Sequence, residues 1–451
     1  MKMKQYFSLF VGLLFAVVFV GCSEQRADQA KRPDWTYSSV VYEMNVRQQS
    51  AEGSFEAAEK RLPFLKDLGV DIIWLMPIHP IGEKGRKGTL GSYYAIRNYR
   101  EVNPEFGTMA DFEQFLAAAH QQGFRVILDF VANHTSPDSE WVEGRDANWY
   151  HRDSLGKPIV QYDWTDISKL NYESQDLRDE MISVMKFWID KGVDGFRCDV
   201  AGEVPDDFWN RAFREVRQQN PDVYFLAEGE GVHFHENGFD ATYAWEFLHL
   251  MEDVAQGKKP ALEIRLWLDR MTQEYPKEAF RLMFTSNHDE NSWAGTEFER
   301  MGDAYETMAA LTYVLPQGQP LIYTGQEIGY DHRFKFFDKD AVQDWTPTKQ
   351  TIFYKKMNAL RHENPALMAG EEGGDFQYLA GMVDSVMAFT RVKGENQVFS
   401  VFNLSKDEQP LLPTQTVQGE WTDALTGEKV EINSGEELTL QPWQYLILTR
   451  K

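Results

Sequence analysis

Eight short apolar runs alternate along most of the chain with longer segments of helical periodicity. The apolar runs are Val40–Asn45, Asp71–Met76, Arg125–Phe130, Gly195–Val200, Val223–Ala227, Phe239–Thr242, Phe280–Thr285 and Leu321–Thr324. Helical patterns follow them at Ser54–Leu68, Met109–Gln122, Gln175–Lys191, Asp206–Gln219, Trp245–Val254, Ala261–Glu274, Asp303–Leu315 and Thr351–His362. This alternation predicts parallel strands joined by crossover helices, and eight such units predict a (β/α)₈ TIM barrel in an α/β protein. We place the barrel between residues 34 and 365.

Two segments depart from the strand–helix alternation. A long aromatic and polar loop, about residues 134–166, follows the third predicted strand. In a barrel such a loop emerges on the face that carries active sites, and ordered loops of this length are commonly functional. After Pro365, short alternating runs separated by turn signals predict an antiparallel β domain over residues 366–451.

The N-terminus has the pattern of an export signal. Lys2 and Lys4 precede an apolar run from Tyr6 to Val20, which is too short to span a bilayer comfortably. The run ends at Gly21-Cys22 and resembles a bacterial lipobox. We therefore predict a lipoprotein signal peptide over residues 1–22, lipidation at Cys22 and a polar tether over residues 23–33. The expected product is an exported, membrane-anchored lipoprotein, periplasmic or on the cell surface; the alternative is a plain signal peptide with an incidental cysteine.

The charge balance excludes one class of partner. The formal net charge is −24. Nonspecific nucleic-acid binding requires basic patches, so no nucleic-acid partner is expected. A hydrophobic share of 43% supplies enough apolar side chains for a large folded core.

Polar residues gather where four predicted strands end. They are Asp129, Asn133 and His134 at the third strand, Arg197 and Asp199 at the fourth, Glu228 and Glu230 at the fifth, and Asn287, His288, Asp289 and Glu290 at the seventh. Buried polar groups are costly unless they are paired, so four such sets at matching positions favour a functional site. Arg197 and Asp199 are two residues apart and should share one face of their strand.

Several carboxylates around one cavity are what retaining glycoside hydrolysis requires. One carboxylate attacks the anomeric carbon, and a second donates and later accepts a proton. An arginine beside the nucleophile would keep it ionised and oriented. A zinc hydrolase would instead need a ligand motif such as HExxH, which the sequence lacks.

Six segments lie in order along the predicted strands and loops. They are GVDIIWLMP at 69–77, DFVANH at 129–134, GFRCDVA at 195–201, FLAE at 225–228, FTSNHD at 284–289 and GQPLIYTGQEIG at 318–329. Together they resemble the α-amylase family of glycoside hydrolases, from roughly Trp35 to the C-terminus. The resemblance implies that the loop after the third strand is a small inserted domain and that the C-terminal domain is an antiparallel β-sandwich.

The resemblance also implies residue roles. Asp199 matches the nucleophile and Glu228 matches the general acid/base. Asp289 matches a third carboxylate, which binds sugar hydroxyls. Glu230 is a rival for the acid, but Glu228 directly ends the apolar run. The substrate-binding set implied by the family comprises Arg197, His134, His288 and Tyr94, the last as a platform under the sugar.

Some positions depart from the family pattern or leave a choice open. Asn98 stands where the family usually has Asp, and Gly202-Glu203 where many members have Lys-His on the leaving-group side. Asn133 matches a family calcium ligand, so a structural calcium ion is one expectation, while an Asn that caps a loop is the other. No cofactor is expected for the chemistry itself.

Three functions fit these residues. The leading one is a hydrolase that cleaves α-glucosidic bonds, mainly α-1,4, in starch-like glucans or malto-oligosaccharides. The second keeps the same site in a transglycosylase or an exo-acting α-glucosidase. The third is a non-catalytic glycan-binding protein, against which the full set Asp199, Glu228, Asp289 and Arg197 argues.

Overall fold

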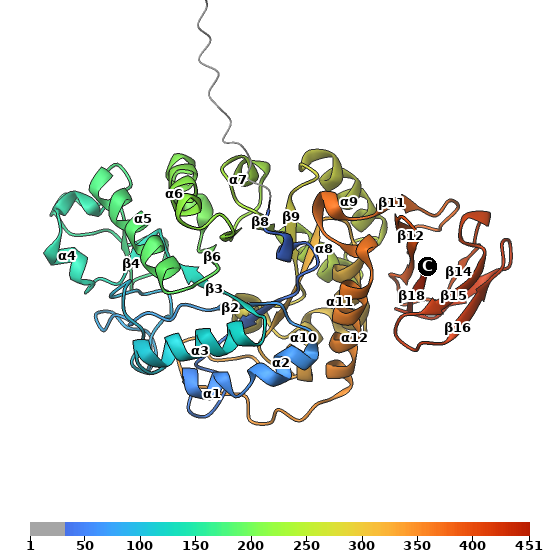
Figure 1. The fold of residues 1–451 in the computed structure, drawn as a ribbon, viewed down its shortest axis with the longest axis horizontal. Coiled ribbons are helices and arrows are strands. Elements are labelled where there is room, and N and C mark those ends of the chain that lie inside the picture. The colour runs from blue at the N-terminus through green and yellow to red at the C-terminus, as the bar shows by residue number, and fades with distance from the viewer. Residues whose placement is uncertain (1–31) are drawn as a thin grey trace, which may run out of the picture. The chain divides into compact units, whose positions relative to one another are not determined.

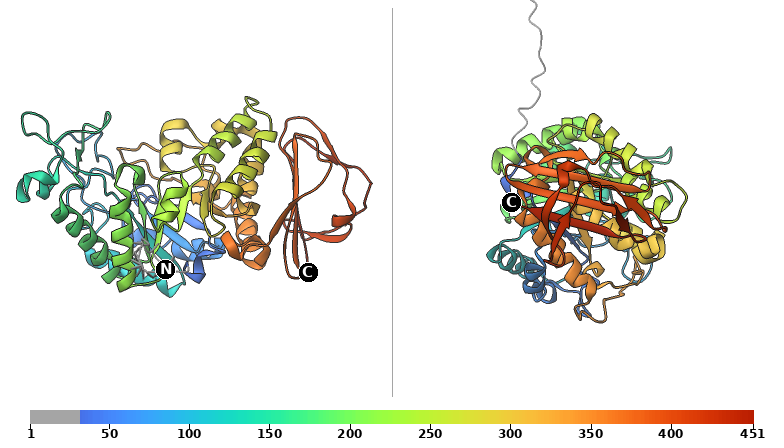
Figure 2. Two further views of the ribbon diagram at one scale, coloured as in Figure 1. Left: turned by 90° about the horizontal axis from the view of Figure 1, so that it is seen from above. Right: turned by 90° about the vertical axis from the view of Figure 1, so that its right-hand side faces the viewer.

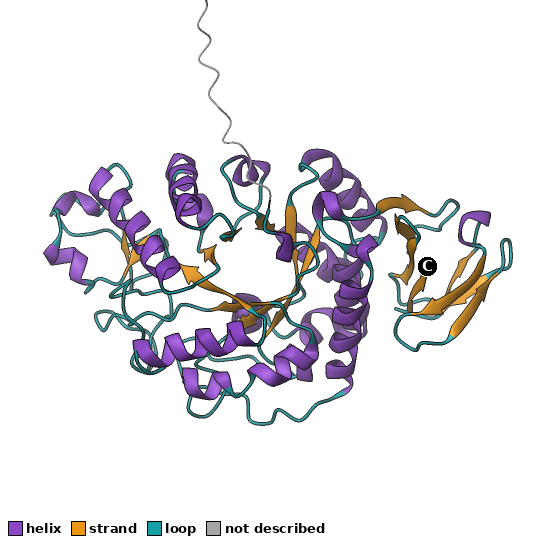
Figure 3. Ribbon diagram, viewed as in Figure 1, coloured by secondary structure: helices purple, strands orange, loops and turns teal. Residues whose placement is uncertain are grey.

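Eight parallel strands close into a barrel in the computed structural model, which describes residues 32–451 (Figures 1 and 3). Around the barrel they are β1 (Val41–Met44), β10 (Gly318–Tyr323), β9 (Phe280–Met283), β8 (Ala241–Tyr243), β7 (Tyr224–Ala227), β6 (Gly195–Cys198), β3 (Arg125–Phe130) and β2 (Ile72–Leu75). This arrangement confirms the predicted TIM barrel. The predicted signal peptide, Cys22 and the tether up to residue 31 lie outside the described residues.

Helices surround the barrel strands (Figure 1). The larger ones are α3 (Met109–Gln121), α5 (Gln175–Asp190), α6 (Asp206–Gln219), α8 (Trp245–Ala255), α9 (Leu262–Glu274), α11 (Tyr305–Val314) and α12 (Lys349–Glu363); the shorter ones are α7 (Val232–Glu236) and α10 (Glu297–Met301). In the part of the chain that the structure describes, none is both long and apolar enough to cross a membrane.

Helix α3 shows how the sequence sets these elements. Thr108 and Asp111 form a capping box, in which each side chain accepts the backbone N–H of the other. Its buried face is Phe112, Phe115, Leu116 and Ala119. These residues recur at the spacing of one helix face, which packs α3 against the barrel.

The first predicted helix is interrupted. In place of one helix over Ser54–Leu68, the structure has α1 (Phe55–Glu59) and α2 (Leu62–Leu68). Pro63 lies in the first turn of α2. Proline has no N–H, and its ring clashes with the carbonyl four residues earlier, so a continuous helix through Glu59 is disfavoured.

The segment after β3 forms the small inserted unit. β4 (His134–Thr135) pairs antiparallel with β5 (Ser168–Lys169), and the chain between them carries α4 (Glu140–Gly144). This pairing returns the chain to the barrel directly before α5, so the insert begins and ends near one strand end.

The C-terminal residues form antiparallel sheets (Figure 2). A six-stranded sheet has the order β11 (Asp375–Tyr378), β12 (Val386–Lys393), β13 (Asn396–Asn403), β18 (Tyr445–Arg450), β15 (Gly419–Asp423) and β16 (Lys429–Ile432); β14 (Gln409–Leu411) pairs with β17 (Leu438–Leu440). Alternate residues of β12 serve two cores. Val386 and Ala388 pack in the core shared with β14 and β17, whereas Met387 and Phe389 join the core of the barrel. The predicted antiparallel β-sandwich is confirmed.

Candidate active site

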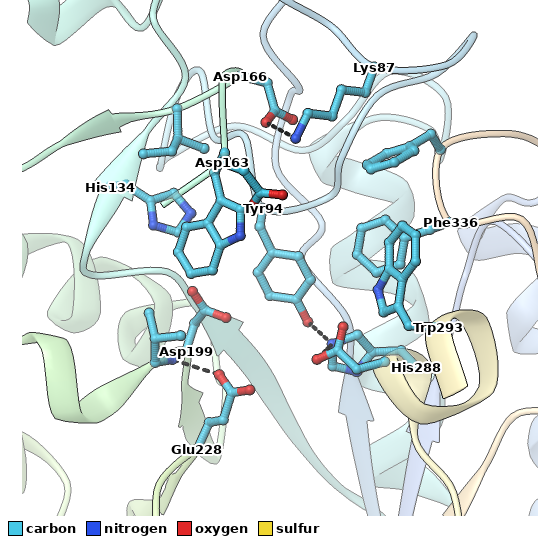
Figure 4. A pocket seen from close by; sticks show the side chains of 15 residues that line it. Lys87, Tyr94, His134, Asp163, Asp166, Asp199, Glu228, His288, Trp293 and Phe336 are labelled. Carbon is cyan, nitrogen blue, oxygen red and sulfur yellow. Dashed lines mark hydrogen bonds and ion pairs between the residues drawn. The ribbon is translucent and has the colours of Figure 1, made fainter. Parts of the chain in front are cut away.

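A cavity of about 400 Å³ opens where the barrel strands end (Figure 4). Its lining includes every predicted catalytic carboxylate. The lining residues are Lys87, Tyr94, His134, Asp163, Trp164, Asp166, Ile167, Asp199, Val200, Glu228, His288, Asp289, Trp293, Phe336 and Phe337. Because the carboxyl ends of all barrel strands meet at one face, residues from six different loops can converge there.

Arg197 is the charged centre of the site. It is fully buried, and its Nη1 lies 2.8 Å from Asp129 Oδ1 and 3.0 Å from Asp199 Oδ1. Its Nη2 lies 2.9 Å from Glu228 Oε2. Burial opposes the positive charge, but Asp129 and Glu228 outweigh burial and hold the pKa of Arg197 well above its usual range. The predicted placement of Arg197 and Asp199 on one face is therefore confirmed by their contact.

Asp199 and Glu228 thus flank one guanidinium. Burial and the neighbouring Glu228 raise the pKa of Asp199 well above its usual range, while Arg197 opposes that rise. Asp199 and Glu228 therefore share one positive partner in the cavity, as the nucleophile and the general acid of one reaction would.

The backbone between the two groups is strained. Val200, directly after Asp199, has φ of 36°, in the left-handed region that β-branched residues rarely adopt. Its backbone N–H donates a hydrogen bond of 2.6 Å to Glu228 Oε2. The turn therefore fixes Glu228 against the residue that follows Asp199, and local strain of this kind is typical of functional sites.

Tyr94, His288 and Asp289 form the opposite wall. The Tyr94 hydroxyl donates to Asp129 Oδ2 at 3.0 Å and lies 2.8 Å from His288 Nε2, and the two rings stack with centroids 5.4 Å apart. His288 Nε2 lies 3.3 Å from Asp289 Oδ2 and its Nδ1 lies 2.5 Å from Glu43 Oε1. Burial opposes protonation of His288, but Asp289 and Glu43 hold its pKa well above the usual range. Burial alone would raise the pKa of Asp289, but His288 lowers it, so Asp289 stays ionised.

His134 lies on the insert side of the cavity, with its ring 5.6 Å from that of Trp164. Burial lowers the pKa of His134 to about 4, so the imidazole is neutral at pH 7. Its Nδ1 lies 3.2 Å from the amide nitrogen of Asn133 and therefore accepts a hydrogen bond. The imidazole also hydrogen-bonds the backbone of Tyr94, so Asn133 and Tyr94 together hold the neutral ring at the cavity wall.

Asn133 takes part in a chain of side-chain hydrogen bonds, and the calcium ion expected there stays a prediction. The Asn133 amide donates to Gln161 Oε1 at 2.7 Å, and Gln161 Nε2 donates to Glu203 Oε2 at 2.6 Å. Of the acidic residues in or near the insert, Asp138 accepts the Glu83 N–H, and Asp166 pairs with Lys87. Within residues 32–451, no three His, Cys, Asp or Glu side chains are grouped so that they could hold a metal ion. A hydrogen-bonded chain of side chains links the insert to the barrel at this position.

Glu230, the rival acid, lies outside the main cavity. It pairs with the buried Arg281 and accepts the backbone N–H of Glu246 at 3.0 Å. The geometry therefore favours Glu228. Asn98, where the family usually has Asp, accepts the Arg100 N–H at 2.9 Å within its own loop.

Other tryptophans and Cys198 have different roles. Trp141 and Trp149 are buried in the insert with their rings 5.2 Å apart, so they serve packing. Trp164 and Trp293 do line the cavity. Cys198 is buried, and burial raises the pKa of its thiol well above the usual range, so it is no nucleophile.

Several residues of the site escaped the sequence analysis. Glu43, at the end of β1, is fully buried beneath His288. A charged residue in an apolar run is a signal that could have identified it. Lys87, Asp163, Phe336 and Phe337 come from loops without periodicity, where no such signal exists.

Comparisons with known proteins agree with this geometry. The sequence matches the family described as the catalytic domain of α-amylase over residues 41–164 and 145–353. It is 30% identical over 417 residues to the alpha-amylase MalA of Haloarcula japonica, covering 88% of this chain and 59% of that protein. It is 27% identical over 436 residues to neopullulanase 2 of Thermoactinomyces vulgaris, covering 88% and 70%. The chain thus spans about three fifths of the length of the first of these curated relatives.

The solved structures give a more complete match. The crystal structure of an alpha-amylase from Lactobacillus plantarum superposes with a TM-score of 0.83 at 31% identity, covering 92% of this chain and all of that one. The agreement includes both the barrel and the C-terminal strands, because so little of either chain is left out. On the family match and this shared fold, the chain belongs to the α-amylase family of glycoside hydrolases.

Proposed function

We propose that this protein is a retaining glycoside hydrolase that cleaves α-glucosidic bonds, mainly α-1,4, in starch-like glucans or malto-oligosaccharides. One observation carries the proposal: Asp199 and Glu228 contact the same guanidinium, at 3.0 and 2.9 Å. Retaining enzymes need their two carboxyl groups about 5–5.5 Å apart, whereas inverting enzymes separate them further to admit a water molecule. Asp199 and Glu228, which contact the one guanidinium of Arg197, suit the shorter separation that retaining enzymes need.

In the first step, Glu228 gives its proton to the glycosidic oxygen while Asp199 attacks the anomeric carbon. The bond from that carbon to the leaving sugar breaks, and an ester to Asp199 forms. In the second step, Glu228 removes a proton from water, and the water oxygen attacks the same carbon and expels Asp199. Each step inverts the carbon, so the product keeps the α configuration.

The other residues bind and orient the sugar. The Tyr94 ring, which stacks on His288 in the cavity wall, offers a flat surface to a pyranose ring. Asp289, kept ionised by His288, accepts hydroxyl hydrogen bonds, and neutral His134 lines the cavity. Arg197 compensates the negative charge that Asp199 carries before attack and Glu228 carries after proton transfer.

The relatives support a glucan substrate. One is named an alpha-amylase and another a neopullulanase, so we propose α-linked glucose polymers for this chain as well. The intermediate that hydrolysis forms could also react with a sugar acceptor, so transglycosylation is the second candidate. The observation that favours it is a second hollow of about 450 Å³ beside Glu228, large enough to hold an acceptor.

A product time course tests the proposal. The chain without its first 22 residues would be incubated with maltoheptaose, and products followed by chromatography and by proton NMR of the anomeric centre. We expect shorter oligosaccharides whose new reducing ends appear first in the α configuration. Products longer than maltoheptaose would shift the assignment to transglycosylation, initial β products would refute retention, and no turnover would contradict the proposed substrate.

We also propose that the protein is exported and held at a membrane by a lipid on Cys22, which the order of charged, apolar and cysteine residues at the N-terminus supports. In bacteria fed labelled palmitate, the full chain is expected to carry the label in the membrane fraction. Cys22→Ser should lose the label and leave that fraction, whereas Cys198→Ala should keep it. Label retained in Cys22→Ser, or absent from the full chain, would refute the anchor.

A further inference from the structure

The cavity has two unlike ends (Figure 4). At the Glu228 end it adjoins the second hollow, which shares Val200 and Glu228 and is further lined by Gly202, Glu203, His233 and Trp245. At the far end, Lys87 Nζ and Asp166 Oδ1 form an ion pair of 3.1 Å. Figure 4 shows this pair across the cavity from Asp199 and Glu228.

Three chain segments close the far end. The loop after β2 carries Lys87, the insert carries Asp166, and the loop after β10 carries Phe337. The Leu90 N–H donates to the Phe337 carbonyl at 2.9 Å, and Thr89 donates through its hydroxyl to Asp338 at 2.6 Å. The β2 loop is therefore fastened to the loop after β10.

The same β2 loop is fastened to the insert. The Glu83 N–H donates to Asp138 Oδ2 at 2.8 Å, which ties the start of the loop down.

The β2 loop also lies very close to the loop after β10. Gly88, with φ of 60°, lies so close to Phe337 that an added Cβ would fall 2.5 Å from the Phe337 Cβ. Only glycine fits this approach. The Lys87–Asp166 pair thus completes a continuous wall.

The chemistry decides which part of a substrate meets this wall. A general acid must stand at the glycosidic oxygen, which leaves with the reducing-end portion of the chain. That portion therefore extends past Glu228 into the second hollow. The portion that becomes attached to Asp199 extends the other way, toward Lys87 and Asp166.

We infer that the Lys87–Asp166 ion pair closes the cavity behind the first sugar units, so that the enzyme acts from the non-reducing end of a glucan. This inference rests on the proposed function. The ammonium of Lys87 and the carboxylates of Asp163 and Asp166 supply the donors and acceptors that the hydroxyls of a terminal glucose require. A chain that continues beyond this point would have to break the pair and displace the β2 loop.

Two substrates test the inference: 4-nitrophenyl α-maltoheptaoside with a free non-reducing end, and the same compound blocked there by a 4,6-O-ethylidene group. Consumption of each would be followed by chromatography. The wild type is expected to consume the free substrate about tenfold faster or more, because the block clashes with the wall. Lys87→Ala and Asp166→Asn should each bring the ratio of the two rates toward one.

Two further variants control this experiment. Lys87→Arg keeps a cation at the wall and should keep the wild-type ratio, and so should Lys84→Ala, which removes an exposed lysine from the same loop. Equal wild-type rates on both substrates would overturn the closed end, and an unchanged ratio in Lys87→Ala and Asp166→Asn would overturn the role of the pair. Failure to consume either substrate would instead refute the proposed function, and the inference with it.

Discussion

Replacing Asp199 by Asn is expected to lower turnover of malto-oligosaccharides by about 10⁴-fold or more, because an amide cannot attack the anomeric carbon. The loss should appear in kcat, with the substrate still bound by the other residues of the cavity. Arg197 keeps Asp129 at 2.8 Å and Glu228 at 2.9 Å, so its charge stays compensated. Initial rates on maltoheptaose, with titration calorimetry for binding, measure both effects.

The same variant is expected to melt at the wild-type temperature or a few degrees above it at neutral pH. Burial and Glu228 raise the pKa of Asp199 in the folded protein. A group with a raised folded pKa contributes stability that is present below its unfolded pKa and lost as the pH rises through its folded pKa. At pH 7 Asp199 is therefore destabilising, and a neutral amide of the same size removes that effect.

A surface substitution controls for the loss of a carboxylate as such. Asp67 is exposed and pairs with Lys355 at 2.6 Å, far from the catalytic residues in sequence and outside the cavity. Asp67→Asn should leave both turnover and melting temperature close to wild type. Near wild-type turnover in Asp199→Asn would show that another residue is the nucleophile, and a large fall in its melting temperature would show a structural role.

The parts of the site that could be predicted from sequence are those attached to regular strands. Arg197 lies in β6, Asp199 directly follows it, and Glu228 directly follows β7, so the period of two and the closure of the barrel determine which way they point. The resemblance to the family then supplied their roles. Both the strand period and the family resemblance apply to residues in or next to regular strands.

The parts that could not be predicted depend on contacts between irregular segments. The Lys87–Asp166 pair joins residues 79 positions apart through two loops, and no periodicity relates them. Trp141, Trp149 and Trp164 all lie in the insert, yet of these three only Trp164 reaches the cavity, because the fold of the insert decides which face is buried. The partner of Asn133 could not be predicted for the same reason: its amide donates to Gln161, which has no signature in the sequence.

Glu228→Gln and Glu230→Gln are expected to differ sharply, although the two residues are two positions apart. Glu228→Gln should lower turnover of maltoheptaose by about 10²–10⁴-fold, the usual contribution of a general acid. Glu230→Gln should lower turnover far less, since Glu230 pairs with Arg281 and lines the second hollow, where it is removed from the bond that breaks. It should instead lower the free energy of unfolding by about 1–3 kcal/mol, because the buried guanidinium loses a charged partner. Steady-state rates and urea denaturation separate the two effects.

Azide distinguishes the acid/base from the nucleophile by the product it leaves. With α-maltosyl fluoride, whose leaving group needs no protonation, Glu228→Gln should still form the ester to Asp199, and azide should resolve it without a base. Azide attacks the anomeric carbon from the face opposite Asp199 and expels the Asp199 carboxylate, so the product is the α-glycosyl azide. In Asp199→Ala no ester forms, and azide entering the space left by the carboxylate yields the β-glycosyl azide. A β product from Glu228→Gln would reverse these assignments, and so would rescue of Glu230→Gln in place of Glu228→Gln. The reason is that the configuration at the anomeric carbon shows from which face azide attacked.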